Sequence, residues 1–400
     1  MIRFKRTLLL ILFVTLITGC HVGRFFIWNF ADIHDYKKFV PGPVANNGTP
    51  FHFIKAQNNQ INLPSFIHIG KDSVEFEKQV ENDGTVALLI IRNDTLYYEK
   101  YFHHYDSSDI VPSFSMAKSF TSALMGIAIQ EGYIGSVDDT ITKYLPELKD
   151  PGFSRITIAN LLDMQSGIKF NESYFNPFGD AAKYYYGRKL IKYMIHQPVK
   201  SPPGEDFEYL SVNTQYLGWI IERATGKPLY EYLEEKIWKP LHMEYPATWS
   251  VDSRNTSTTK AFCCLNARAI DFAKFGRLYL QEGNWDGEQI VDSGWVHAST
   301  NVTTNKNYFI YSYQWWHNTE FSILRDSNQL IPPYRTGNVS MPDKTTQPIV
   351  VRPAGDFYAE GFLGQFIYVN PSKKIIIVRL GKKYGKTNWN KLFLKISKAN

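Results

Sequence analysis

Apolar runs near both ends of the chain predict β-strands. Residues 86–91 and 95–102 flank the polar turn Arg92-Asn93-Asp94, a pattern that predicts an antiparallel hairpin. Similar runs follow late in the chain, at residues 311–316, 356–359, 365–369 and 375–380. Because strands come from both chain ends, we expect them to join in one sheet.

In the middle of the chain, apolar positions recur at helical spacing instead. We expect helices capped by Thr157, started by Ser211 or Asn213 and ended at Gly226, and further helices at residues 230–238, 269–280 and 389–396. The predicted fold is therefore α+β: a mainly antiparallel central sheet built from both chain ends, with flanking helices and a helical subdomain. The site would lie in the cleft between sheet and subdomain.

Residues 1–20 have the pattern of a targeting segment. A basic start is followed by an apolar run and by Ile17-Thr18-Gly19-Cys20, which is typical of a bacterial lipoprotein signal peptide with its lipobox. A transmembrane anchor is the alternative, although the run is short for one. Lipidation of Cys20 would tether the chain to a membrane on the periplasmic side of a bacterial envelope. We expect residues 21–75 to be a spacer and residues 76–400 to form the domain.

Composition excludes several classes. Loss of three positive charges with residues 1–19 lowers the formal charge from +6 to +3, and no basic cluster follows, so a nucleic-acid partner is not expected. Three cysteines do not make a disulfide framework, and we expect Cys263 and Cys264 to be buried thiols. No His, Asp or Glu spacing predicts a metal site, and no cofactor is expected.

The segment from Val111 to Gly132 carries the candidate chemistry. It is expected to form one helix whose first turn holds Ser115, with Lys118 three residues later on the same face. Unpaired N–H groups at a helix start favour developing negative charge. A second copy of this S-x-x-K pattern, Ser257 to Lys260, lies in a polar stretch that we expect to be a loop.

Two later motifs complete a resemblance. Tyr209-Leu210-Ser211 follows Ser115-Met116-Ala117-Lys118 in the order of the serine β-lactamase and penicillin-binding-protein superfamily, which this chain resembles over roughly residues 80–381. YLSVNTQ and Gly361-Phe362-Leu363-Gly364-Gln365 are most similar to the branch of 6-aminohexanoate-dimer hydrolases. Serine replaces the asparagine of Y-x-N, however, and the K-T-G motif of β-lactam enzymes is missing.

The resemblance and the residue chemistry imply a set of roles. Ser115 would attack a carbonyl to form an acyl-enzyme, with Lys118 and an exposed Tyr209 sharing a proton. The ammonium should lower the pKa of the phenol, so that Tyr209 relays protons while Lys118 tunes it. The oxyanion hole would combine the N–H of Ser115 with one from Gly361–Leu363, Phe362 being preferred.

Some assignments stay open at this stage. Ser211 and Asn213 are either helix caps or substrate contacts. Glu360 is either an exposed carboxylate or a partner for a cationic substrate group. The predicted function is a serine hydrolase of a small amide or ester. The alternatives are a peptidoglycan D-amino-acid peptidase or β-lactamase, and a non-catalytic envelope-binding lipoprotein.

Overall fold

The computed structural model describes residues 21–28, 30–57, 61–301, 310–341 and 345–400. The predicted signal peptide and Cys20 lie outside these residues. Within these ranges, no helix combines the length and the apolar character needed to cross a membrane.

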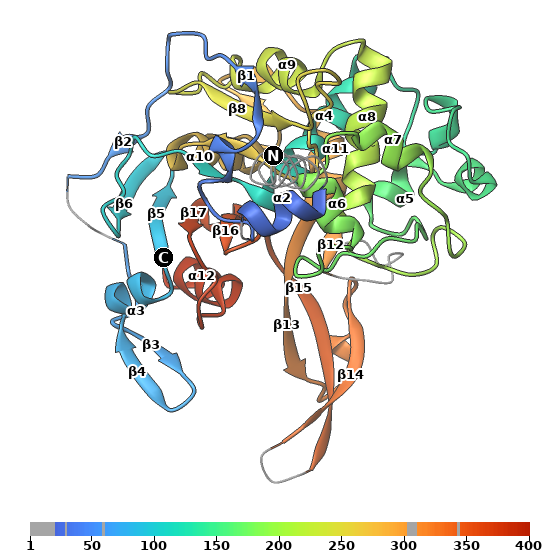
Figure 1. Ribbon diagram of the computed structural model, residues 1–400. Helices are drawn as coiled ribbons and strands as arrows, with labels where there is room; N and C mark the ends of the chain where they lie inside the picture. Colours follow the sequence, from blue (N-terminus) through green and yellow to red (C-terminus); the bar gives the residue numbers. More distant parts are fainter. Residues whose placement is uncertain (1–20, 29, 58–60, 302–309, 342–344) are drawn as a thin grey trace, which may run out of the picture.

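A nine-stranded sheet built from both ends of the chain forms the centre of the molecule, as the sequence predicts (Figure 1). The strands are, in sheet order, β12 (Tyr311–Ser312), β13 (Trp315–Ile323), β15 (Thr346–Gly361), β16 (Gln365–Asn370), β17 (Ile375–Gly381), β5 (Thr85–Arg92), β6 (Thr95–Tyr101) and β2 (Ile54–Lys55), with β14 (Arg335–Ser340) paired to β15. The predicted hairpin is confirmed as β5 and β6, which run antiparallel. Positive φ angles at Asn93 and Asp94, 50° and 56°, suit its two-residue turn.

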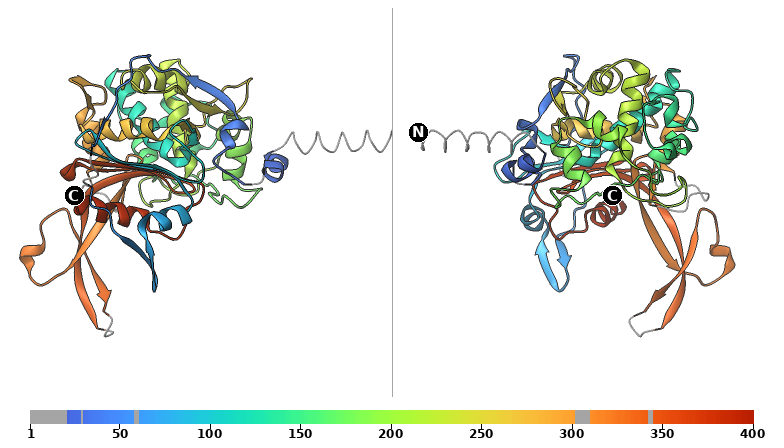
Figure 2. Two further views of the ribbon diagram at one scale, coloured as in Figure 1. Left: turned by 90° about the vertical axis from the view of Figure 1, so that its left-hand side faces the viewer. Right: turned by 45° about the vertical axis from the view of Figure 1, so that its right-hand side comes forward.

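Both faces of this sheet are covered by helices (Figure 2). On one face Leu89, Ile367 and Val378 join a core that includes α10 (Ala269–Leu280), whose bounds match the prediction. Their neighbours Leu88 and Phe366 point the other way, toward α12 (Trp389–Lys398) and α3 (Phe76–Asn82). The alternation follows from the two-residue period of a strand.

The remaining helices form the predicted helical part beside the sheet (Figure 1). They are α4 (Ala117–Gln130), α5 (Ile158–Leu162), α6 (Asp180–Tyr186), α7 (Leu190–Ile195), α8 (Ser211–Thr225), α9 (Leu229–Leu233) and α11 (Ser293–Thr300). Thr157 caps α5 as predicted, through a capping box with Asn160. The helix ends at Leu162, and Met164 then turns the chain with a φ of 58°.

Residues 21–75, expected to be a spacer and lead-in, contain regular structure in their described part. After α2 (His21–Trp28), strand β1 (Val40–Val44) pairs along its whole length with β8 (Ala247–Val251) in a four-stranded sheet of order β1-β8-β9-β7. β1 is an edge strand, which tolerates the prolines that break its sequence pattern. Strand β2 extends the central sheet, and β3 (Phe66–Ile69) and β4 (Asp72–Glu75) form a hairpin.

Strands β13, β14 and β15 extend into an arm that projects from the body (Figure 1). The prediction had covered only residues 356–359 of β15, which in fact has 16 residues. β14 is largely exposed, and the outer half of β15 is mostly half-buried, but its sequence TQPIVVRPAG does not alternate between apolar and polar residues as a half-buried strand usually does.

Candidate active site

Ser115 lies on a turn between a strand and a helix. Residues 111–112 form β7, which pairs with β9 (Leu265–Ala267), and Ser115 occupies the 3-10 helix η2 (Phe114–Met116) that precedes α4. The expected single helix over residues 111–132 is therefore wrong at its start. The N–H of Ser113 donates to Leu265 O (2.7 Å), which holds this segment on the sheet, and Phe114 then turns the chain with a φ of 44°.

Lys118 points back to Ser115 from the first turn of α4. Its Nζ donates to Ser115 Oγ (2.9 Å), to Ser211 Oγ (3.1 Å) and to Phe262 O (3.0 Å). The side chain is only 1% exposed. Burial lowers the pKa of Lys118 to about 8, although the nearby Glu172 carboxylate opposes this shift. The neutral amine, which can accept a proton, is therefore far easier to form than it is for a lysine in water.

Glu172, which sequence reasoning missed, joins this group from a loop before α6. Its carboxylate accepts hydrogen bonds from the Ser211 N–H (2.8 Å), the Ser211 hydroxyl (2.5 Å) and the Tyr174 hydroxyl (2.8 Å). Glu172 thus accepts from a backbone N–H at the start of α8, where no side chain next to the helix forms a cap. The predicted capping role of Ser211 or Asn213 is therefore wrong. A continuous path of hydrogen bonds runs from Glu172 through Ser211 and Lys118 to Ser115.

Asn213 does not reach the candidate site. Its side chain is 0% exposed, its Oδ1 accepts from Ser166 Oγ (2.5 Å), and its Nδ2 contacts Met164 Sδ (3.2 Å). The structure thus gives Asn213 a role in packing the first turn of α8. It is withdrawn as a substrate contact, whereas Ser211 stays at the site.

Tyr209 meets Ser115 and Lys118 from the segment just before α8. Its ring packs on Trp316 and Tyr311, with centroids 5.3 and 5.9 Å apart, so the side chain is half-buried and not exposed as predicted. Lys118 Nζ lies over the face of this ring, 5.1 Å from its centroid. The Tyr209 hydroxyl forms a hydrogen bond with the Ser115 side chain, so all three side chains meet.

The electrostatics of Tyr209 are opposite to the prediction. Burial raises the pKa of Tyr209 above its ordinary value of 10.0, a hydrogen bond with the Ser115 side chain opposes the rise, and the Glu172 and Glu360 carboxylates add to it. The expected lowering of the Tyr209 pKa by Lys118 is wrong. Burial and two carboxylates raise this pKa, and they outweigh an amine whose own charged form is disfavoured by burial. Tyr209 is thus a protonated phenol that can donate.

The end of β15 passes close to the backbone of Ser115. A Cβ added at Gly361 would lie 2.2 Å from Ser113 O and 3.2 Å from Ser115 N, so only glycine permits this approach. The next residue, Phe362, packs edge-on against Phe114, with centroids 5.7 Å apart. This places the Gly361–Phe362 backbone beside the Ser115 N–H, as the predicted oxyanion hole requires.

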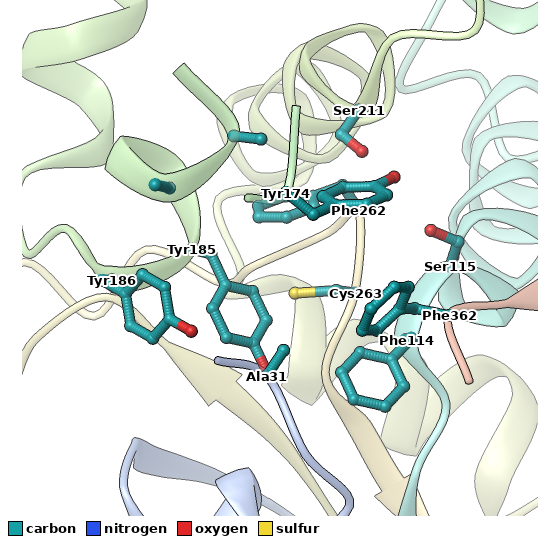
Figure 3. A pocket seen from close by; sticks show the side chains of 12 residues that line it. Ala31, Phe114, Ser115, Tyr174, Tyr185, Tyr186, Ser211, Phe262, Cys263 and Phe362 are labelled. Carbon is teal, nitrogen blue, oxygen red and sulfur yellow. The ribbon is translucent and has the colours of Figure 1, made fainter. Parts of the chain in front are cut away.

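Two cavities meet at Ser115. The first, here called the apolar pocket, runs from Ser115 and Phe362 past Phe262 and Cys263 to Tyr185 and Tyr186 (Figure 3). The second, here called the open hollow, shares Ser115 and Phe362 with the first and is also lined by Tyr209, Trp316, Glu360 and Tyr384, among others. A substrate bound across Ser115 can place one part in each.

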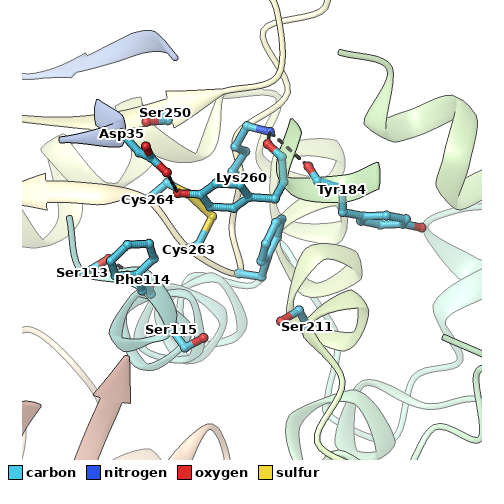
Figure 4. Close-up of a disulfide and its surroundings, with 12 residues drawn as sticks. Asp35, Ser113, Phe114, Ser115, Tyr184, Ser211, Ser250, Lys260, Cys263 and Cys264 are labelled. Carbon is cyan, nitrogen blue, oxygen red and sulfur yellow. Dashed lines mark hydrogen bonds between the residues drawn. A yellow bond between two sulfur atoms is a disulfide. The ribbon is translucent and has the colours of Figure 1, made fainter. Parts of the chain in front are cut away.

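Cys263 and Cys264 form a disulfide beside the apolar pocket, which corrects the prediction of two thiols (Figure 4). Cys264 has a φ of 70°, and this sharp turn brings two neighbouring side chains to one side, where an extended chain would separate them.

The second S-x-x-K copy is a loop, as predicted, although its lysine is buried. Lys260 is 0% exposed and donates to Tyr184 O (3.1 Å) and Tyr185 O, whereas Ser257 is half-buried. Among the described residues, no three His, Cys, Asp or Glu side chains are grouped so as to hold a metal ion.

Comparison with known proteins gives consistent relatives. The model of the family described as Beta-lactamase matches residues 76–392. A 6-aminohexanoate-dimer hydrolase from Paenarthrobacter ureafaciens is 28% identical over 263 residues, which are 60% of this chain and 66% of that protein. An N-acetylmuramyl-L-alanine amidase from Bacillus subtilis (strain 168) is 32% identical over 117 residues, 27% of this chain and 26% of that protein.

A solved structure from Bacillus anthracis, described provisionally as a 6-aminohexanoate-dimer hydrolase, has 25% identity and a TM-score of 0.74. The match covers 92% of this chain and 93% of that one. The matches to the two curated relatives, in contrast, span 66% or less of their lengths.

Proposed function

Because this chain belongs to the β-lactamase family, we propose that it is a serine hydrolase that cleaves a small amide or ester through an acyl-enzyme on Ser115. The observation that carries this proposal is the buried Lys118 amine, 2.9 Å from Ser115 Oγ, with the Tyr209 phenol at the same point. A serine hydroxyl needs such a base within hydrogen-bond reach.

In acylation, Ser115 Oγ attacks the carbonyl carbon and its proton passes to the neutral form of Lys118. Tyr209, which is protonated, donates its proton to the leaving amine or alcohol and takes one back from Lys118. The carbonyl oxygen, now negative, is held by the N–H groups of Ser115 and Phe362. In this order, Lys118 takes the proton of Ser115, and Tyr209 relays a proton from Lys118 to the leaving group.

In deacylation, a water attacks the acyl carbon and gives its proton to the Tyr209–Lys118 pair, which returns a proton to Ser115 Oγ. Glu172 supports both steps without touching substrate. Its carboxylate fixes Ser211 and, as a nearby negative charge, stabilises the ammonium that forms when the amine accepts a proton.

Similarity to the two named relatives, a dimer hydrolase and an amidase, supports an amide as the natural bond. A peptidoglycan D-amino-acid peptidase or a β-lactamase is the competing activity. Both act on substrates that carry a carboxylate, and the chain has Ala359-Glu360-Gly361 in the place where K-T-G would help hold one. A carboxylate in the open hollow repels such a group, so we expect fluorescent penicillin to leave the protein unlabelled.

The second S-x-x-K copy offers a matched control for the main test. A fluorophosphonate should label the protein and a chromogenic short-chain ester should be hydrolysed, and Ser115→Ala should abolish both. Ser257→Ala, in the second copy, should leave both intact. Retained labelling and turnover in Ser115→Ala would refute the proposal, and failure of every acyl probe on the wild type would favour a non-catalytic binding lipoprotein.

Attachment to the bacterial envelope by a lipid on Cys20, facing the periplasm, is part of the proposal and is supported by the sequence pattern of residues 1–20 alone. Cells expressing the full chain should incorporate labelled palmitate into it. Incorporation that persists in Cys20→Ala would contradict the assignment.

A further inference from the structure

Helix α2 turns apolar side chains outward and a charged one inward. Arg24 is 3% exposed, and its Nε donates to the backbone oxygen of Tyr186 at the end of α6 (2.6 Å). Phe26 and Ile27, in contrast, are 64% and 53% exposed. Phe25 fixes this orientation, because its ring packs against Tyr186 with centroids 5.5 Å apart. A surface helix in water has the reverse pattern, so the outer side of α2 indicates an apolar partner.

The loop before α6 extends this exposed surface. Phe30, which follows α2, packs on Phe25 and on Phe175 of the loop, with centroids 5.4 and 5.9 Å apart. Both Phe30 and Phe175 are exposed. Phe26 also packs on Phe25, so these side chains are continuous. Phe26, Ile27, Phe30 and Phe175 are here called the apolar face.

The apolar pocket reaches the surface beside the apolar face. Ala31, the residue after Phe30, and Tyr174, the residue before Phe175, both line that pocket (Figure 3). Tyr174 is 41% exposed, and its ring also packs on Phe362, with centroids 5.4 Å apart. Apolar surface therefore continues from the apolar face to the backbone that is proposed to hold the carbonyl oxygen of the substrate.

The position of the proposed anchor selects a lipid bilayer as the partner of this surface. α2 begins at His21, directly after Cys20 in the sequence. A lipid on Cys20 would hold α2 at the membrane without an intervening linker. Helices that lie in the membrane interface bury phenylalanine and aliphatic side chains in it, which are the side chains that the apolar face presents.

We propose that the apolar face docks on the lipid bilayer and places the mouth of the apolar pocket there. The preferred substrate is then an amide or ester that is small enough for the pocket, apolar enough to partition into the membrane, and enters from the lipid. The place of docking rests on the proposed lipidation of Cys20, and substrate entry rests on the proposed hydrolase function. The reaction at Ser115 is unchanged.

A fluorescent label on a single thiol tests the docking. Cys263 is joined to Cys264 and Cys20 would be modified, so Phe26→Cys and Phe175→Cys each add one free thiol for a nitrobenzoxadiazole dye. In the full chain, purified from membranes into vesicles of phosphatidylethanolamine and phosphatidylglycerol, the emission should shift to the blue. A doxyl-labelled phosphatidylcholine should quench it.

The projecting arm offers a matched control position. Phe321, on β13, is 63% exposed, and the arm points away from α2 in both views of Figure 2. Dye on Phe321→Cys should show neither the blue shift nor the quenching. On the wild type, a phospholipid with a photoreactive diazirine in its acyl chain should cross-link to α2 and not to β13, which tests docking without any substitution.

Three results would overturn docking. The first is the absence of quenching at Phe26→Cys and Phe175→Cys together with no cross-link to α2. The second is the absence of the full chain from the membrane fraction. The third is a blue shift that appears without vesicles and grows with protein concentration, because a second copy of the chain would then cover the apolar face.

Turnover tests substrate entry separately. 4-Nitrophenyl octanoate partitions into vesicles, whereas 4-nitrophenyl acetate stays in water. With vesicles present, the ratio of kcat/KM for octanoate over acetate should fall at least about tenfold in Phe26→Ser/Phe175→Ser, with acetate turnover retained. Phe321→Ser should keep the wild-type ratio. An unchanged ratio in the double variant would refute entry from the bilayer.

The fluorescence measurement separates this proposal from the proposed function, because it needs no turnover and applies equally to Ser115→Ala. Quenching in a protein that hydrolyses no ester would sustain docking and refute the hydrolase. Hydrolysis of both esters without quenching or cross-linking would sustain the hydrolase and refute docking.

Discussion

Replacement of Lys118 by methionine should make the stability of the protein less dependent on pH. The wild-type lysine has a pKa of about 8 in the fold against an ordinary 10.5, because it is buried among neutral acceptors. The folded state therefore resists protonation of Lys118 and carries a cost of about 3 kcal/mol well below pH 8. That cost shrinks as the pH rises from 8 toward 10.5 and is absent above both values.

The sign follows from proton binding. Between pH 8 and 10.5 the unfolded chain holds a proton on Lys118 that the folded chain lacks, so the free energy of unfolding of the wild type rises with pH. From pH 7 to pH 9 the wild type should gain about 1 kcal/mol relative to Lys118→Met. Contributions from other groups cancel in the difference when they titrate alike in both proteins.

Urea unfolding at pH 7, 8 and 9 measures this difference. Lys192→Met, on α7 at an exposed position, is the matched control and should differ from wild type by the same amount at every pH, because its side chain stays in water in both states. A Lys118→Met difference that does not change with pH would refute the argument that burial lowers the pKa of Lys118. The ester kcat/KM of the wild type should also rise with pH through about 8, as the neutral amine forms.

Three further predictions concern the residues around Lys118. Glu172→Gln should move the rising limb of the pH–rate profile below 8, by roughly half a pH unit to one unit, because the carboxylate that supports the ammonium is gone; an unmoved limb would contradict the Glu172–Ser211–Lys118 path. Tyr209→Phe should lower kcat by about 10²–10⁴-fold with an unchanged melting temperature, since the ring contacts with Trp316 and Tyr311 remain; full activity would remove the relay role. Gly361→Ala should lower kcat by about 10²-fold or more, because the added Cβ would force β15 away from Ser113 O and Ser115 N. A near-normal kcat in a variant that circular dichroism shows to be folded would mean that this backbone is not part of the oxyanion hole.

Local pattern determined much of the fold. The β5–β6 hairpin, the bounds of α10 and the closing helix α12 follow from periodicity and turn residues, because those features depend on which face of a segment is buried. The contact of Lys118 with Ser115 also follows from sequence, since residues three apart share a helix face even though Ser115 stands in a preceding 3-10 turn.

Exposed or non-periodic segments escaped prediction. The outer half of β15 and edge strand β1 lack the apolar alternation that identifies a half-buried strand, and only their pairing partners β13 and β8 establish them. The disulfide of Cys263 with Cys264 depends on a sharp local turn that neighbouring residues in a sequence do not reveal.

The amino-acid sequence by itself determined which elements form and brought the serine, the lysine and the tyrosine into consideration through short-range spacing and motif order. Tertiary structure alone decided how those groups are charged. Glu172 reaches Ser211 across 39 residues, Glu360 lines the open hollow from the end of β15, and burial shifts the pKa of Lys118 and Tyr209 in opposite directions. Sequence periodicity predicts whether a side chain is buried. The electrostatic field at that side chain, however, comes from distant segments that only the folded chain brings together.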